Sequence, residues 1–137
     1  MKYLISWLPL FLLIFNTCIF SGSLQAQERE MVEAEAAIKI GSAKDLSKHF
    51  SDNVEISFEG KKNNYSKTQA EFVLRDFFSK NESNPNSFEN YHRGNSGKSL
   101  NYSIVKYSSK NGSFRVFMKI KQQQNRFVID SIDINKE

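Results

Sequence analysis

The chain has 137 residues, of which 19 are Lys or Arg and 15 are Asp or Glu, so its formal net charge is +4. Charges of both signs are interspersed along it, without the basic block that would indicate a nucleic-acid partner. A chain of this length has room for one domain and not two.

The amino-terminal segment predicts export. It has a positive start, residues 4–20 are almost wholly apolar, and small and polar residues follow. This order is typical of a secretory signal peptide over residues 1–26, with cleavage expected between Ala26 and Gln27. The signal carries one cation and no acid, so its removal lowers the net charge from +4 to +3. The mature protein would be a single domain, residues 27–137, in the periplasm or outside the cell.

Two other interpretations of this segment fit it less well. A membrane anchor would need about 20 apolar residues in a row, and Pro9 and Asn16 interrupt this run. A lipoprotein signal would place a cysteine after the run, whereas Cys18, the only cysteine, lies inside it. Without the signal the chain has no cysteine, which excludes disulfides, thiol catalysis and cysteine-bound metal. The alternative is a domain tethered by an uncleaved signal; after cleavage we expect no stable membrane span.

The first half of the mature chain predicts two helices and a strand. Residues 28–40 carry an apolar stripe at helical spacing, and Ser42 starts a second, short helix. Residues 52–53 are interpreted as a turn. Apolar and polar residues alternate over residues 54–59, which predicts a half-buried strand, and residues 60–64 are interpreted as the turn that closes it. The stripe of the first helix comprises Met31, Val32, Ala34 and Ile38.

The segment YSKTQAEFVLRDFF, residues 65–78, predicts a third helix. Ser66 and Gln69 have the spacing of a capping box, in which each side chain bonds a free backbone N–H at the helix start. Glu71 and Arg75 lie four residues apart on the outer face, as in a surface ion pair. The apolar face comprises Ala70, Val73, Leu74, Phe77 and Phe78. A helix explains every residue of the segment, so it does not indicate a catalytic motif.

The rest of the chain predicts an antiparallel meander of four strands joined by short polar connections. The strands are expected near residues 88–93, 100–107, 113–121 and 126–134. Asn111 and Gly112 suit a tight hairpin turn. A turn centred on them would place Tyr107 opposite Val116.

This hairpin has two different faces. The core face comprises Val105, Tyr107, Phe114, Val116, Met118 and Ile120. The outer face comprises Tyr102, Ile104, Lys106, Arg115, Phe117, Lys119 and Lys121. In the last strand the apolar pattern slips by one residue, which predicts a bulge near Asp130 and Ser131.

The order of these elements, α-α-β-α-β-β-β-β, resembles the nuclear-transport-factor-2-like superfamily, whose fold is also called the cystatin-like cone. The first half matches the superfamily's succession of helix, glycine, short helix, turn acid and strand at Gly41, Leu46, Phe50, Asp52 and Val54. More narrowly, YSKTQAEFVLRDFF, HRG and NGSFRVF are similar to an uncharacterised family of small exported bacterial proteins, the domain-of-unknown-function family 4783. The resemblance implies an α+β fold in which a curved antiparallel sheet wraps the helices and encloses a pocket.

The superfamily includes ketosteroid isomerases, dehydratases, ligand-binding and protein-binding domains, and homodimers that pair through the sheet, so the fold does not decide the function. Proton-transfer enzymes need a desolvated acid or histidine in the cone, whereas the predicted inward positions here are apolar. We therefore expect a non-enzymatic domain, without cofactor or metal, that binds a small apolar ligand or a protein partner; a homodimer through the sheet is one option. The candidate pocket residues are His92, Val105, Tyr107, Phe114, Val116 and Met118.

The alternative is a small enzyme of isomerase or dehydratase type. It would use His92 together with Asp130 or Asp133, whichever carboxylate faces the cone. The other histidine, His49, is expected beside Phe50 on the short helix, exposed or partly packed. Two histidines without short spacing do not indicate a metal site.

Overall fold

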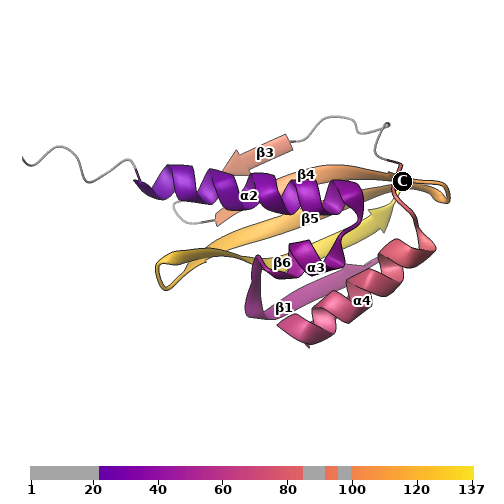
Figure 1. Cartoon of the computed structure of the whole chain (residues 1–137), viewed down its shortest axis with the longest axis horizontal. Helices are drawn as coiled ribbons and strands as arrows, with labels where there is room; N and C mark the ends of the chain where they lie inside the picture. The colour runs from indigo at the N-terminus through magenta and orange to yellow at the C-terminus, as the bar shows by residue number, and fades with distance from the viewer. Residues whose placement is uncertain (1–21, 85–91, 96–99) are drawn as a thin grey trace, which may run out of the picture.

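The computed structural model describes residues 22–84, 92–95 and 100–137. In this part of the chain three helices pack against one six-stranded sheet (Figure 1). The helices are α2 (Gly22–Ile40), α3 (Ala43–Ser47) and α4 (Lys67–Lys80). The strands are β1 (Phe50–Phe58), β2 (Lys61–Ser66), β3 (His92–Asn95), β4 (Leu100–Ser109), β5 (Gly112–Gln123) and β6 (Arg126–Lys136). The start of the strand expected over residues 88–93 lies outside the described residues.

The strands follow the order β2-β1-β6-β5-β4-β3 across the sheet. Neighbouring strands are antiparallel, except that β1 and β6 run parallel. The α+β class and the meander from β3 to β6 are confirmed. The sheet is mixed rather than purely antiparallel, because the last strand inserts between β1 and β5.

The strand β1 is longer than predicted, and β2 was not predicted. Residues 52–53 are not a turn but lie within β1, where the pairing with β6 is irregular between Phe50 and Glu55. Residues 60–64 were predicted to be a turn, but most of them belong to β2. The chain reverses direction between β1 and β2 through Glu59 (φ 51°) and Gly60 (φ 79°). Most residues of β2 are polar and exposed, so this edge strand lacks the apolar alternation that reveals a half-buried strand.

The β4–β5 hairpin has the predicted faces but a different register. Its turn is centred one residue earlier than expected, so Tyr107 pairs with Phe114 and not with Val116. This moves the pairing by two residues, and because side chains alternate with period two, every residue keeps its predicted face. The bulge is confirmed, since the pairing of β5 with β6 skips Asp130.

The core lies between the helices and one face of the sheet. Its largest fully buried side chains are Ile38, Leu46, Ile56, Leu74, Val105, Tyr107, Met118, Ile120, Ile129, Ile132 and Ile134, among others. Val32 was expected in the stripe of α2, but it is 45% exposed. Glu35 on the same helix is buried instead, and it accepts a hydrogen bond from the Ser103 hydroxyl (2.5 Å).

The helix α4 begins as predicted. The Ser66 hydroxyl accepts a hydrogen bond from the Gln69 backbone N–H, and the Gln69 side chain accepts one from the Ser66 N–H. Ala70, Leu74 and Phe78 are buried. The helix lies alongside β1 in Figure 1, and Phe72 on it is 61% exposed.

Candidate functional site

The structure places the five strand residues of the predicted pocket inside the core. Val105, Tyr107, Phe114, Val116 and Met118 are all at most 8% exposed. The Tyr107 hydroxyl donates a hydrogen bond to the backbone oxygen of Asn81 (2.5 Å), and burial raises the pKa of Tyr107 to about 12. These side chains therefore fill the space between sheet and helices, and a pocket-lining role for them stays a prediction.

The residues required by the enzyme alternative lie on strands that are not neighbours in the sheet. The backbone of His92 pairs with Ile104 at the start of β3, and its side chain lies outside the described residues. Both carboxylates lie on β6, and β4 and β5 separate β6 from β3. At the usual strand spacing the backbones of β3 and β6 are about 14 Å apart. Asp130 instead forms an ion pair with Lys121, and Asp133 alternates with buried core residues.

An apolar groove lies beside α4. Its lining residues are Phe58, Phe72, Val73, Asp76 and Phe77, and its volume is about 430 Å³. Four of them come from two successive turns of α4 and lie on the same side of the helix. The fifth is the last residue of β1. We call this feature the α4 groove.

The floor of the α4 groove is anchored in the core. The ring of Phe77 lies 5.6 Å from that of Phe58 and 5.1 Å from that of Phe114, and it also contacts Phe78 and Tyr107. Such ring separations fall in the range of favourable aromatic pairs. The groove is therefore fixed by packing that exists without a ligand.

The rim of the α4 groove is an exposed aromatic side chain. Phe72 is 61% exposed, and the Arg75 guanidinium lies over its ring at 5.1 Å. Arg75 is held in turn by the predicted ion pair with Glu71, whose carboxylate also accepts a hydrogen bond from Ser47 (3.1 Å). The sequence contained a signal for this rim, since Phe72 is an apolar residue outside the apolar face assigned to the helix.

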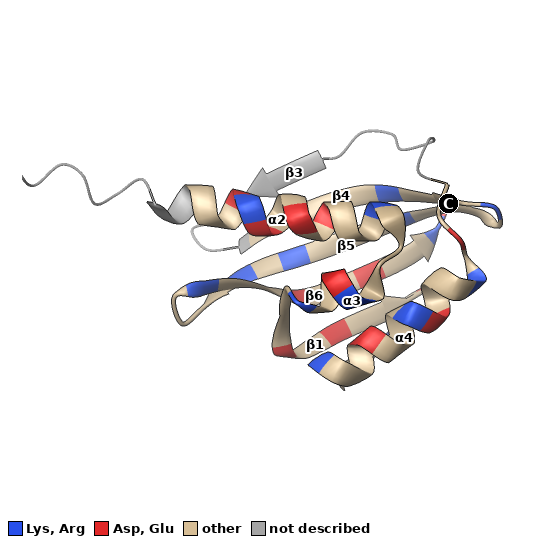
Figure 2. Cartoon of the chain, in the orientation of Figure 1, with Lys and Arg blue, Asp and Glu red and all other residues tan. Residues whose placement is uncertain are grey.

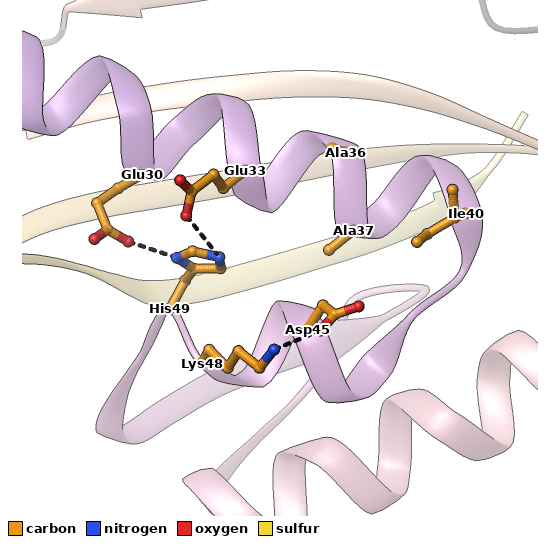
Figure 3. A pocket seen from close by; sticks show the side chains of 8 residues that line it. All are labelled: Glu30, Glu33, Ala36, Ala37, Ile40, Asp45, Lys48 and His49. Carbon is orange, nitrogen blue, oxygen red and sulfur yellow. Dashed lines mark hydrogen bonds and ion pairs between the residues drawn. The ribbon is translucent and has the colours of Figure 1, made fainter.

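A second pocket, of about 470 Å³, lies between α2 and α3 (Figure 3). We call it the α2–α3 pocket. It is lined by Glu30, Glu33, Ala36, Ala37, Ile40, Asp45, Lys48 and His49. Lys48 is engaged by Asp45 (2.7 Å), and the hydrogen bonds from Lys48 and Ser42 lower the pKa of the Asp45 carboxyl.

His49 occupies a more specific place than predicted. It does not lie on the short helix as expected but follows Lys48, the C-cap residue of α3, and its side chain is only 11% exposed. Its Nδ1 lies 2.5 Å from Glu30 Oε2, and its Nε2 lies 3.9 Å from Glu33 Oε2. The sequence could have suggested the carboxylate pair, because residues three apart share a helix face. The contact of this pair with a histidine in another element could not be foreseen from spacing.

The charges elsewhere follow the predicted interspersed pattern (Figure 2). Among residues 22–84, 92–95 and 100–137 no group of three or more His, Cys, Asp or Glu side chains is arranged to hold a metal ion. The helices in these ranges are also too short or too polar to cross a membrane.

The fold defines the class to which the protein belongs, that of the cystatin-like and nuclear-transport-factor-2-like folds. A nuclear-transport-factor-2-like protein of unknown function from Shewanella oneidensis matches with a TM-score of 0.58 and 10% identity, over 82% of this chain and 98% of the other. A protein of unknown function with a cystatin-like fold from Nostoc punctiforme matches with a TM-score of 0.58 and 7% identity, over 83% and 90% of the two chains. These identities show the fold alone.

Within this class the chain belongs to the domain-of-unknown-function family DUF4783, whose profile matches residues 31–135. The crystal structure of a DUF4783 family protein from Bacteroides ovatus matches with a TM-score of 0.66 and 31% identity, over 77% of this chain and 93% of the other. The family resemblance expected from the sequence is confirmed. No curated protein matches the chain.

Proposed function

We propose that the protein is an exported, non-enzymatic binding domain that holds a small apolar molecule in the α4 groove. The observation that carries this proposal is the continuous apolar lining of the groove by Phe58, Phe72, Val73 and Phe77. Its volume of about 430 Å³ lies within the usual range for small-molecule sites, about 300–1,000 Å³. Exposed Phe72 and the partly buried Phe58 and Phe77 line one groove, and contiguous apolar patches of this kind mark binding surfaces.

The groove is already formed without a ligand, which supports a binding function rather than a packing defect. Phe77 is locked by its ring contacts in the core, and Arg75 stacks on Phe72. A site that is already ordered loses little conformational entropy when a ligand binds. Asp76 stands at the edge with its carboxylate paired to Lys80 (2.7 Å), which leaves the apolar surface as the main source of affinity.

A titration with the neutral fluorescent probe N-phenyl-1-naphthylamine tests this proposal. We expect saturable binding to the wild-type domain, weakened about fivefold by Phe72→Ala because roughly 1 kcal/mol of apolar contact is removed. The matched control is Phe117→Ala, which removes a half-buried aromatic ring, stacked on Tyr102, from the outer face of the sheet. Equal effects of the two substitutions, or no saturable binding at all, would overturn the small-ligand assignment.

Export is the second part of the proposal. It is supported by the apolar run and the flanking residues of the amino-terminal segment. Helix α2 continues through Ala26 and Gln27, and from residue 25 onward its first buried residue is Met31, so cleavage at the predicted bond would leave this packed part of the helix intact. The intact mass of the protein recovered from the periplasm or medium should correspond to residues 27–137. A full-length mass in the membrane fraction would favour the tethered alternative.

A further inference from the structure

A further pocket lies where the β5–β6 hairpin meets the beginnings of β1 and α4. Its volume is about 200 Å³, smaller than the usual range for drug-sized ligands, about 300–1,000 Å³. We call it the hairpin pocket. Most of its lining side chains are polar, in contrast to those of the α4 groove. The lining residues are Phe50, Ser51, Asp52, Lys67, Gln123, Gln124, Arg126 and Val128.

Two positively charged side chains of the hairpin pocket have no carboxylate partner within the described residues. Lys67 is the first residue of α4, and its Nζ donates a long hydrogen bond to the backbone oxygen of Lys48 (3.4 Å). Arg126 is the first residue of β6, and it is exposed. Asp52 lines the same pocket, but it forms an ion pair with neither of them. An anionic ligand would therefore bind these cations without displacing an existing ion pair.

The other polar groups of the hairpin pocket both donate and accept hydrogen bonds. Gln123 pairs with Arg126 across the hairpin, so their side chains lie on the same face. A glutamine amide offers N–H donors and a carbonyl acceptor, whereas the ionised Asp52 carboxylate only accepts. The two apolar lining residues, Phe50 and Val128, are buried, so the accessible lining is polar. A complementary ligand has an anionic group for the cations and hydroxyl groups for the amides and the carboxylate.

The backbone of Gln124 is in an unfavourable conformation. Its φ is 48°, in the left-handed region that glycine adopts more readily than other residues. The turn therefore keeps a long amide side chain at a position where glycine would be less strained, and this side chain lines the pocket. Residues held in such conformations cluster at ligand-binding sites. The strain at Gln124 thus supports a binding function for the pocket independently of its charge.

We propose that the hairpin pocket binds a small hydroxylated carboxylic acid of the sugar-acid class. The carboxylate would bond Arg126 and Lys67, because the arginine fork matches a carboxylate in a bidentate pair. The hydroxyl groups would donate to Asp52 and exchange hydrogen bonds with the amides of Gln123 and Gln124. The small volume limits the enclosed part of the ligand to about one sugar ring. This site is separate from the α4 groove and does not depend on the function proposed for that groove.

The same carboxylate and hydroxyl groups occur in a free sugar acid and in the terminal residue of an acidic polysaccharide. Two probes separate these sources: D-glucuronate, and its methyl β-glycoside, which carries a substituent where a polysaccharide chain would continue. Tighter binding of D-glucuronate indicates a free acid as the natural ligand. Equal or tighter binding of the methyl glycoside indicates a chain end.

An NMR titration of the protein with these probes tests the proposal. The signals to follow are the side-chain amides of Gln123 and Gln124 and the methyl groups of Val128, which all line the pocket. We expect saturable shifts with D-glucuronate, and none over the same concentrations with D-glucose, which lacks the carboxylate, or with acetate, which lacks the hydroxyl groups. Equal shifts with D-glucose or acetate, or no saturable shifts with either glucuronate probe, would overturn the proposal.

Two variants test the assigned contacts. Arg126→Gln should weaken D-glucuronate binding about tenfold, because a charge-assisted hydrogen bond to the carboxylate is lost. Arg115→Gln is the matched control, since Arg115 is also exposed but lies on β5 outside the pocket. Gln124→Gly should weaken binding without lowering the thermal stability, because glycine adopts the positive φ without strain. Equal binding by the two arginine variants, or undiminished binding by Gln124→Gly, would contradict the proposal.

Discussion

His49 Nδ1 lies 2.5 Å from Glu30 Oε2, which ties the residue between α3 and β1 to the middle of α2. The backbone oxygen of the same histidine accepts a hydrogen bond from the N–H of Ile129 on β6 (2.7 Å). One residue therefore joins α2, the start of β1 and β6. This position gives His49 a structural role.

Removing the carboxylate partner should destabilise the fold. Glu30→Ala deletes a hydrogen bond to a charged group, and because that group is partly exposed we expect a loss of about 1 kcal/mol in the free energy of unfolding. Urea denaturation at pH 7 measures it. Glu33→Ala is the comparison, with an expected loss below about 0.5 kcal/mol because its oxygen lies 3.9 Å from the ring. A larger loss for Glu33→Ala would contradict this ranking.

The hydrogen bond between the Ser103 hydroxyl and Glu35 should also contribute to stability. Both residues are buried, so Ser103→Ala leaves the Glu35 carboxylate with one hydrogen-bond donor fewer. We expect a loss of about 1–2 kcal/mol in the free energy of unfolding. Ser57→Ala is a matched control, since the Ser57 hydroxyl is equally buried but has no hydrogen-bond partner within the described residues. That substitution should be neutral or stabilising. Similar losses at both serines would show that the bond to Glu35 contributes little.

Alkaline pH should reveal the burial of Tyr107. Its pKa is raised to about 12, above the usual value of about 10 that applies in the unfolded chain. The protonated hydroxyl therefore stabilises the folded state fully below pH 10, and this contribution is lost as the pH rises towards 12. The free energy of unfolding of the wild type should fall more steeply over this range than that of Tyr107→Phe. Parallel pH profiles would be inconsistent with a buried tyrosine hydroxyl at this position.

The cap of α4 should be structural only. Ser66→Ala removes the hydroxyl that accepts a hydrogen bond from Gln69, and we expect a loss of about 1 kcal/mol in the free energy of unfolding. Binding of an apolar probe in the α4 groove should be unchanged, because Ser66 is not among the groove's lining residues. Thermal denaturation and a probe titration on the same variant measure both effects. Lost binding at unchanged stability would assign a ligand-binding role to Ser66.

The sequence was sufficient for features set by local periodicity. The faces of the β4–β5 hairpin, the cap of α4 and the bulge at Asp130 follow from alternation or spacing within a few residues, and the structure confirms each. The parallel pairing of β1 with β6 joins residues that are 76 to 79 positions apart, and no local pattern encodes it. The His49–Glu30 contact is of the same kind, since it depends on how α2 packs over α3.

The most direct test of the α4 groove is where an apolar probe binds. In an NMR titration with N-phenyl-1-naphthylamine, methyl signals of Val73 should shift strongly, because its side chain lines the groove. The methyl signals of Val105, Val116 and Met118 should stay in place, because these side chains are buried in the filled core. Saturable shifts at Val105, Val116 and Met118 without a shift at Val73 would place the ligand inside the cone and contradict the assignment of the α4 groove.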